Sequence, residues 1–286
     1  MAAYHQNEMK VYKTNKGILI ERGSKFCLHQ EDWDTFINDD NLRAKLLTLT
    51  EQLPQADNPD ELISKGIEAP LQGQELWACG VTYLRSKVGR QEESKAAGGG
   101  DFYARVYEAE RPEVFFKATN HRVVPHGGKV RIRKDSTWDA PEPELTLVVT
   151  SSGTIVGYTI GNDMSSRSIE GENPLYLPQA KTYDGCAAVG PCVYIPDGEL
   201  PADTQIKLEI IRDGKVAFEG SVGIDQMKRT PKELVSFVFR ECSFPHGCLI
   251  MTGTGIVPSH EFTLEPGDEV RISIGAIGTL INYVER

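Results

Sequence analysis

Two carboxylates, one residue apart at the entry to an apolar run, constrain this chain more than any other feature. Glu142 and Glu144 precede residues 145–150, whose composition predicts a β-strand. Side chains at positions i and i+2 of a strand point to the same face, so both carboxylates are directed at one place. A second apolar run covers residues 155–160, and Ser152-Gly153 before it predicts a two-residue hairpin turn.

This hairpin predicts a metal site. Its register places Glu142 opposite Asp163, and cross-strand neighbours share a face at about 5 Å. Three converging carboxylates would repel one another without a cation between them. All-oxygen ligands with no His or Cys close by in sequence favour Mg²⁺ or Mn²⁺ over Zn²⁺. The alternative is a solvated, acidic strand end, because an isolated Glu-x-Glu pattern is common.

Charge and composition narrow the class of partner. The net charge of -10 argues against nucleic acid or an anionic membrane, whereas an anionic substrate would need a local cation to bind. No apolar run approaches the roughly 20 residues that span a bilayer, and the first residues lack a signal-peptide pattern. Six cysteines without a Cys-x-x-Cys pair favour reduced, buried thiols and a cytoplasmic protein.

The chain divides into two predicted domains. Residues 1–72 are expected to form a small N-terminal α+β domain, with strands in 11–20 and 23–29 and a helix in 31–53 that Asp39 or Asp40 caps part-way. Residues 73–286 are expected to form the catalytic domain. Its charged segment at about 84–110, with three consecutive glycines, is a lid candidate; a disordered surface loop is the alternative.

The last third of the chain predicts scaffold. Asp213-Gly214 between two alternating runs is a type I′ hairpin signal, and Thr230-Pro231-Lys232-Glu233 is a capping box at a helix start. Many strands, few helices and no alternation of strand and helix favour an α+β fold that is mostly β, with a curled core.

Five motifs, in order, resemble the fumarylacetoacetate hydrolase superfamily over about residues 77–284. They are RPEVFFKAT (111–119), DAPEPEL (139–145), GNDMSSR (161–167), NPLYLPQAK (173–181) and Gly253-Thr254. The resemblance implies a mixed β-roll or curled-barrel catalytic domain and a Mg²⁺ ion held by Glu142, Glu144 and Asp163. It also implies a small-molecule substrate with a 2-oxo acid head, and a homodimer or homotetramer.

Residues 103–119 and 169–181 resemble the branch of this superfamily that dehydrates 2-keto-3-deoxy sugar acids. In the hydrolase branch, a lid His paired with a Glu activates water. Residues 80–113 contain no His, which counts against hydrolysis of acylpyruvates or diketo acids. His121 and His126 keep that alternative open, although we expect both to be structural.

The resemblance gives residue roles for a dehydration that yields 2,5-dioxopentanoate. Lys181 is the expected base, since a Lys beside a metal and partly desolvated loses its proton more easily, and Glu113 is the expected acid. The reverse assignment stays open. Tyr83, Arg85 and Thr254 are expected to contact the substrate.

Ordinary alternatives exist for each of these residues. Lys181 and Arg85 could be surface cations, Glu113 a strand-start carboxylate and Thr254 a turn hydroxyl. A non-catalytic, metal-stabilised binding protein is the alternative for the whole chain, although it would need no acid–base pair. Arg167 is expected to support the Asp163 carboxylate from behind.

Overall fold

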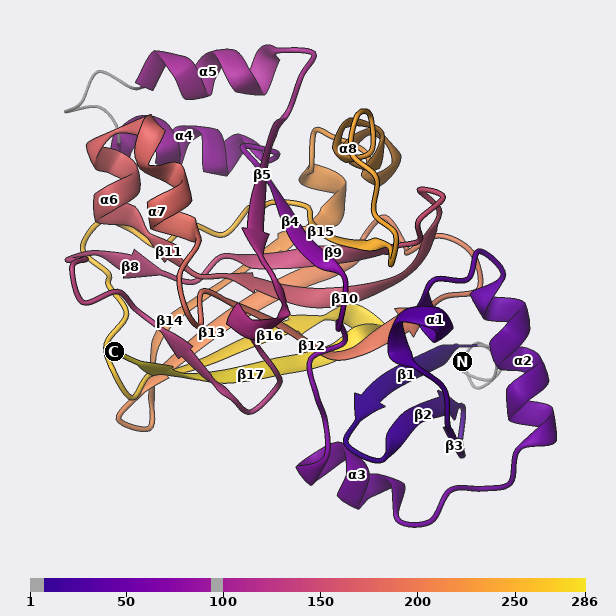
Figure 1. The fold of residues 1–286 in the computed structure, drawn as a ribbon. Coiled ribbons are helices and arrows are strands. Elements are labelled where there is room, and N and C mark those ends of the chain that lie inside the picture. Colours follow the sequence, from indigo (N-terminus) through magenta and orange to yellow (C-terminus); the bar gives the residue numbers. More distant parts are fainter. Residues whose placement is uncertain (1–7, 94–99) are drawn as a thin grey trace.

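The computed structural model describes residues 8–93 and 100–286, and β-strands dominate it (Figure 1). The predicted α+β, mostly β fold is confirmed. The larger sheet runs, in spatial order, through β3 (Lys25–His29), β2 (Gly17–Arg22), β1 (Met9–Thr14), β12 (Ala187–Ile195), β10 (Ile155–Asp163), β9 (Pro143–Val149), β15 (Cys248–Met251), β4 (Glu75–Gly80) and β5 (Glu113–Ala118), with β6 (Val123–Val124) paired to β12.

A second sheet packs beneath the first in Figure 1. Its order is β14 (Lys215–Gly223), β13 (Gln205–Arg212), β16 (Glu269–Ile274), β17 (Gly278–Glu285) and β7 (Lys129–Arg131), while β8 (Asp139–Ala140) and β11 (Ser165–Ser166) form a separate pair. One apolar cluster joins the two sheets, and Ile160, Leu208 and Ile272 are among its fully buried members. Burial of this surface is the main force that holds the layers together.

The β13–β14 connection confirms the predicted hairpin. Arg212 pairs with Lys215, which leaves a two-residue turn. Asp213 and Gly214 have φ values of 51° and 72°, and positive φ at both central positions defines the type I′ turn.

The N-terminal residues form three strands rather than the two predicted, because β1 and β2 turn at residues 15–16. The predicted helix is divided into α1 (Trp33–Ile37) and α2 (Leu42–Gln52), and α3 (Pro59–Lys65) follows. Neither Asp39 nor Asp40 caps α2, whose N-cap residue is Asn41. The Asp40 Oδ1 atom accepts hydrogen bonds from the hydroxyls of Thr150 and Ser152 instead. β1 pairs with β12, so the N-terminal strands extend the larger sheet. The domain boundary at residue 72 stays a prediction.

Several helices lie above the larger sheet in Figure 1. They are α4 (Leu84–Glu93), α5 (Gly100–Glu108), α6 (Arg167–Glu172), α7 (Leu177–Lys181) and α8 (Pro231–Val238), with short 3-10 turns at Asn120–Arg122, Pro174–Tyr176, Ile224–Gln226 and Gly275–Ile277. The Thr230 N-cap is confirmed, because its hydroxyl accepts from the Glu233 amide at 3.2 Å, whereas the Glu233 side chain accepts from Arg229 Nη1 at 2.6 Å. Gly98 and Gly99 of the lid candidate lie outside the described residues, and the lid stays a prediction.

The structure also bears on the predictions of reduced, buried cysteines and of no membrane-spanning segment. All six cysteines are free thiols, and five of them are buried while Cys242 is exposed. No described helix has the length and apolar character that a membrane crossing needs.

Candidate metal and active site

The acidic hairpin has the predicted register but a different turn. Gly161 lies opposite Glu144, and the Asp163 amide donates to the Glu142 carbonyl at 2.9 Å. The two-residue turn is wrong, since residues 150–154 separate the strands and the Thr150 amide bonds the Thr154 carbonyl. A bulge between residues 155 and 157 inserts one extra residue, which restores the register near the carboxylates.

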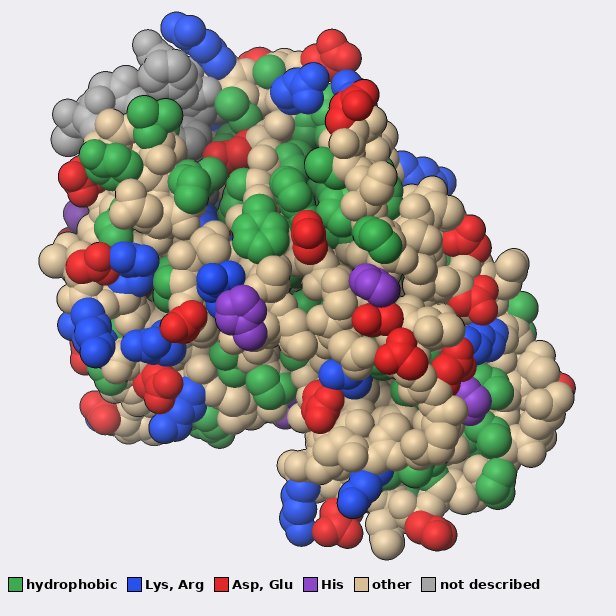
Figure 2. Space-filling model, in the orientation of Figure 1, with side chains coloured by type: hydrophobic (Ala, Val, Ile, Leu, Met, Phe, Trp, Pro, Cys, Tyr) green, Lys and Arg blue, Asp and Glu red, His purple; other side chains and the backbone are tan. Residues whose placement is uncertain are grey.

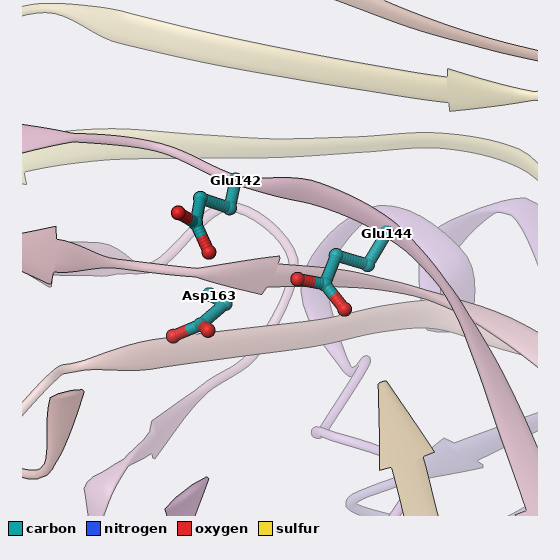
Figure 3. A group of neighbouring side chains, drawn as sticks. All are labelled: Glu142, Glu144 and Asp163. Atoms are coloured by element: carbon teal, nitrogen blue, oxygen red, sulfur yellow. The ribbon is translucent and has the colours of Figure 1, made fainter. Parts of the chain in front are cut away.

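Glu142, Glu144 and Asp163 converge as predicted. One carboxylate oxygen from each lies within 4.8 Å of the others, and Figure 3 shows the side chains gathered from the two paired segments. The residues are only 4%, 1% and 1% exposed, so the solvated strand end is excluded. Three buried oxygen donors in one place suit a hard divalent cation such as Mg²⁺.

Glu144 is the carboxylate with the most unfavourable surroundings. Burial, and then the neighbouring charges of Asp163 and Glu142, raise its pKa well above the ordinary value. The Gly253 amide donates a hydrogen bond to its Oε2 at 2.5 Å. Removing an anion from water beside two others costs free energy, and a bound cation offsets that cost. The unfavourable burial of the Glu144 carboxylate beside two others is therefore the observation that these residues fit a metal ion.

Lys181 lies inside the carboxylate cluster. Its Nζ donates to Glu142 Oε2 at 2.6 Å, to Asp163 Oδ2 at 2.9 Å and to the Ser165 hydroxyl at 2.6 Å. The residue is fully buried at the C-terminal end of α7, so a surface lysine is excluded. Glu170 Oε1 lies 4.0 Å from the same nitrogen. The amine is therefore held where a substrate bound to the cluster would meet it.

Lys117 is a component of the site to which the sequence analysis assigned no role. Its Nζ is fully buried, lies 2.5 Å from Asp163 Oδ1 and donates to the Met164 carbonyl at 2.9 Å and to the Lys181 carbonyl. The sequence pattern that could have identified Lys117 is a lysine within an apolar strand, two positions from Phe115 and four from Glu113. That spacing places all three on one strand face.

Arg167 contacts a different carboxylate from the one expected. Its Nη2 donates to Glu142 Oε1 at 2.7 Å, so the predicted support of Asp163 is wrong. The Ser166 hydroxyl caps α6, which begins at Arg167 and turns this side chain back into the protein. Glu142 is thus held by two cations, Lys181 on one oxygen and Arg167 on the other.

A small pocket opens onto the carboxylates. Besides the three acidic residues it is lined by Cys79, Gly80, Val81, Ser86, Phe115, Gly253 and Thr254. Glu113 pairs with Gly80 across the β4–β5 ladder, and its Oε2 is buried. The pocket therefore brings together the triad and Thr254, and the predicted acid Glu113 lies next to the lining residue Gly80.

The comparison with known proteins agrees with this arrangement. The model for the C-terminal domain of fumarylacetoacetate (FAA) hydrolase matches residues 87–285. The chain belongs to the fumarylacetoacetate hydrolase family. Among curated members, it is 48% identical to a probable 2-keto-3-deoxyxylonate dehydratase of Haloferax volcanii, over 86% of this chain and 82% of that protein.

A second curated protein and a solved structure are also similar to the chain. A 2-dehydro-3-deoxy-D-arabinonate dehydratase of Saccharolobus solfataricus is 44% identical, over 77% of this chain and 74% of that protein. A solved structure of 2-keto-3-deoxy-D-arabinonate dehydratase complexed with magnesium and 2,5-dioxopentanoate has a TM-score of 0.81 and 34% identity, and covers 97% of this chain and 98% of its own.

The histidines bear on which chemistry this family member performs. No histidine lines the pocket among the described residues. His121 is exposed and bonds the Thr119 hydroxyl, while His126 accepts the Ile281 amide on Nδ1 at 3.2 Å. Both serve local structure, as expected.

The three predicted substrate residues lie in different surroundings. Thr254 lines the pocket and is 5% exposed. Tyr83 is buried, with a hydroxyl that has no hydrogen-bond partner in the described structure; burial and the charge of Glu144 raise its pKa. Arg85 is exposed on α4, whereas Ser86 turns inward and donates to the Tyr83 carbonyl at 2.8 Å. The substrate contacts of all three stay predictions.

Proposed function

We propose that the chain is a Mg²⁺-dependent dehydratase that converts a 2-keto-3-deoxy pentonate to 2,5-dioxopentanoate. The observation that carries the proposal is the buried Lys181 amine, hydrogen-bonded to two carboxylates of the triad, with Glu113 paired to Gly80, a residue that lines the pocket. The names of the similar proteins support the substrate class.

Glu142, Glu144 and Asp163 are the proposed ligands of Mg²⁺, and Mn²⁺ has the same preference for oxygen. The bound ion supplies a Lewis acid for the 2-oxo acid head of the substrate. Lys117 and Arg167 orient the ligands Asp163 and Glu142, and such outer contacts commonly set metal affinity.

The protein's own groups then move two protons. Lys181 takes a proton from carbon 3, and Glu113 protonates the hydroxyl that leaves carbon 4 as water. The unsaturated alcohol shifts its double bond to carbons 4 and 5 by proton transfers and becomes the aldehyde. The overall change is the loss of one water. In the reverse assignment Glu113 is the base and Lys181 the acid, and pH–rate profiles of Glu113→Gln and Lys181→Met distinguish the two.

Two other functions are weaker. Hydrolysis of an acylpyruvate or a diketo acid would need a base that activates water, and no histidine lines the described pocket. A non-catalytic binding protein would have no use for a buried amine beside an acidic triad.

The wider setting of the enzyme is also a proposal. We place catalysis in residues 73–286, with α4 and α5 as a lid over the pocket and Tyr83, Arg85 and Thr254 as substrate contacts. We expect a homodimer or homotetramer, as the family resemblance implies. Five buried free thiols and the acidic net charge favour a cytoplasmic enzyme that binds neither nucleic acid nor membrane.

A coupled assay tests the proposal. Purified protein, Mg²⁺ and racemic 2-keto-3-deoxypentonate are mixed, and 2,5-dioxopentanoate is followed through a semialdehyde dehydrogenase. Product that disappears with Lys181→Ala and in EDTA would establish the dehydratase. Cleavage of an acylpyruvate with no dioxopentanoate would replace it with the hydrolase.

A further inference from the structure

Gly80 and Glu113 form the last pair of the β4–β5 ladder, and the glutamate side chain folds across the glycine. A Cβ atom added at Gly80 would lie 1.7 Å from Glu113 Oε2, 2.7 Å from its Cδ and 3.3 Å from its Cγ. The nearest neighbours of that Cβ therefore all belong to one side chain. No amino acid with a Cβ can occupy position 80 while Glu113 keeps this conformation.

The backbone at Gly80 does not itself require glycine. The residue lies within a regular strand, and its φ is not among the positive values of the chain. Gly253, which also lines this pocket, differs because its φ of 96° is one that other residues rarely adopt. The structural demand for glycine at position 80 thus comes from the Glu113 carboxyl group.

The space at Gly80 that the Glu113 carboxyl group fills lies beside the proposed active site. Gly80 lines the pocket together with the metal triad and Phe115, which follows Glu113 by two positions on the same strand face. The Lys181 amine is 5.7 Å from the centre of the Phe115 ring. Glu113 and Glu144 both act on the Cys79 thiol, whose pKa is raised mainly by burial and further by these two charges.

One oxygen of the Glu113 carboxyl group lacks a hydrogen-bond partner. Glu113 Oε2 is buried and has no hydrogen-bond partner among the described residues. Leaving such an oxygen without a donor costs free energy, so the conformation needs a reason. A substrate hydroxyl in the pocket would supply the missing hydrogen bond.

We propose that Gly80 is a positioning residue, whose missing side chain leaves the space from which Glu113 reaches the substrate. The inference rests on the proposed function for the role of Glu113, but not for the contact itself. Figure 2 shows hydrophobic side chains gathered on this face over the region of β4 and β5.

A double-mutant cycle in thermal stability tests the contact without any assay of activity. Gly80→Ala should be clearly less favourable in the wild-type background than in a Glu113→Ala background, because only the wild type has a carboxyl group that the new methyl group must displace. In the Glu113→Ala background the methyl group meets no carboxyl group, and the substitution should leave Tm unchanged or raise it. Equal changes of Tm in both backgrounds would overturn the inference.

Kinetics test the positioning role. Gly80→Ala should lower kcat about 10²-fold or more, to the level of Glu113→Ala, and remove the same limb of the pH–rate profile. KM and the Mg²⁺ Kd should stay near wild type, and the double variant should be no slower than Glu113→Ala. Gly80→Ala with Glu113→Asp, whose side chain is shorter, should recover part of the rate.

The two proposals fail in different ways. A wild-type protein inactive on 2-keto-3-deoxypentonate, with a non-additive stability cycle, would reject the dehydratase and keep the Gly80 contact. An active wild type in which Gly80→Ala turns over normally would keep the dehydratase and reject the positioning role.

Discussion

The Nζ atom of Lys181 lies 2.6 Å from Oε2 of Glu142, and both residues are buried. The amine therefore shares the carboxylate oxygens that a metal ion would use. This contact makes Lys181 both the proposed proton carrier and a charge that competes with the metal for the same ligands.

Lys181→Met should separate these two roles. We expect kcat to fall about 10²- to 10⁴-fold, as for loss of a general base or acid. Mg²⁺ should bind at least as tightly as in wild type, because a competing cation has been removed from the triad. Activity assays and isothermal titration calorimetry measure the two effects, and Lys129→Met at an exposed position is the control. Weaker Mg²⁺ binding with unchanged kcat would contradict the assignment.

Glu144→Gln and Glu142→Gln should have opposite effects on the stability of the protein in EDTA. Glu144 has its pKa raised by burial and by neighbouring carboxylates, so it is destabilising when ionised, above its unfolded pKa. Its neutral amide should add about 1 kcal/mol or more to the free energy of unfolding at pH 7. Glu142→Gln leaves Lys181 and Arg167 poorly compensated and should cost about 3 kcal/mol.

The same pair of variants tests metal binding. Wild-type protein should gain about 2.7 kcal/mol of stability at a Mg²⁺ concentration 100 times Kd. Both variants should gain much less at that concentration, because each lacks one carboxylate ligand. Denaturant unfolding with EDTA and with Mg²⁺ provides the measurement. A full Mg²⁺ response in either variant would remove that residue from the ligand set.

Lys117→Met should weaken metal binding although Lys117 is no ligand. Its amine holds Asp163 Oδ1 and the carbonyl of Lys181, so its loss frees one ligand and the end of α7. We expect Mg²⁺ affinity to fall about 10- to 100-fold, together with a loss of stability. Calorimetry and thermal unfolding, with Lys129→Met as control, decide the matter. Unchanged affinity in a folded variant would make Lys117 purely structural.

His126 should make stability depend on pH at a distance from the site. Burial lowers its pKa, and its Nδ1 accepts the Ile281 amide, which only an unprotonated nitrogen can do. The unfolded chain therefore takes up the proton first, and stability should fall as pH drops through the unfolded value of about 6.5. His126→Asn should reduce this loss between pH 7 and 5. An identical pH dependence in both proteins would exclude His126 as its source.

The sequence determined the acidic hairpin and most of what surrounds it. Strand periodicity directs Glu142 and Glu144 to one face, and the register brought in Asp163, because these depend only on local backbone geometry. The predicted two-residue turn of this hairpin was wrong while its predicted register was right, because a β-bulge compensated for the longer loop. The Asp213-Gly214 turn and the Thr230 N-cap were equally local, and both were confirmed.

Tertiary structure decided which carboxylate each cation contacts, and added Lys117 to the site. Lys117 comes from β5, Lys181 from α7 and Arg167 from α6, and their contacts depend on how these elements pack around the hairpin. The contact between Glu113 and Gly80 also depends on tertiary structure, because the two residues pair across neighbouring strands and lie 33 positions apart in the sequence. Local propensity fixes periodicity and turns, but the partners of a long side chain are fixed by long-range packing, which no local pattern in a single sequence contains.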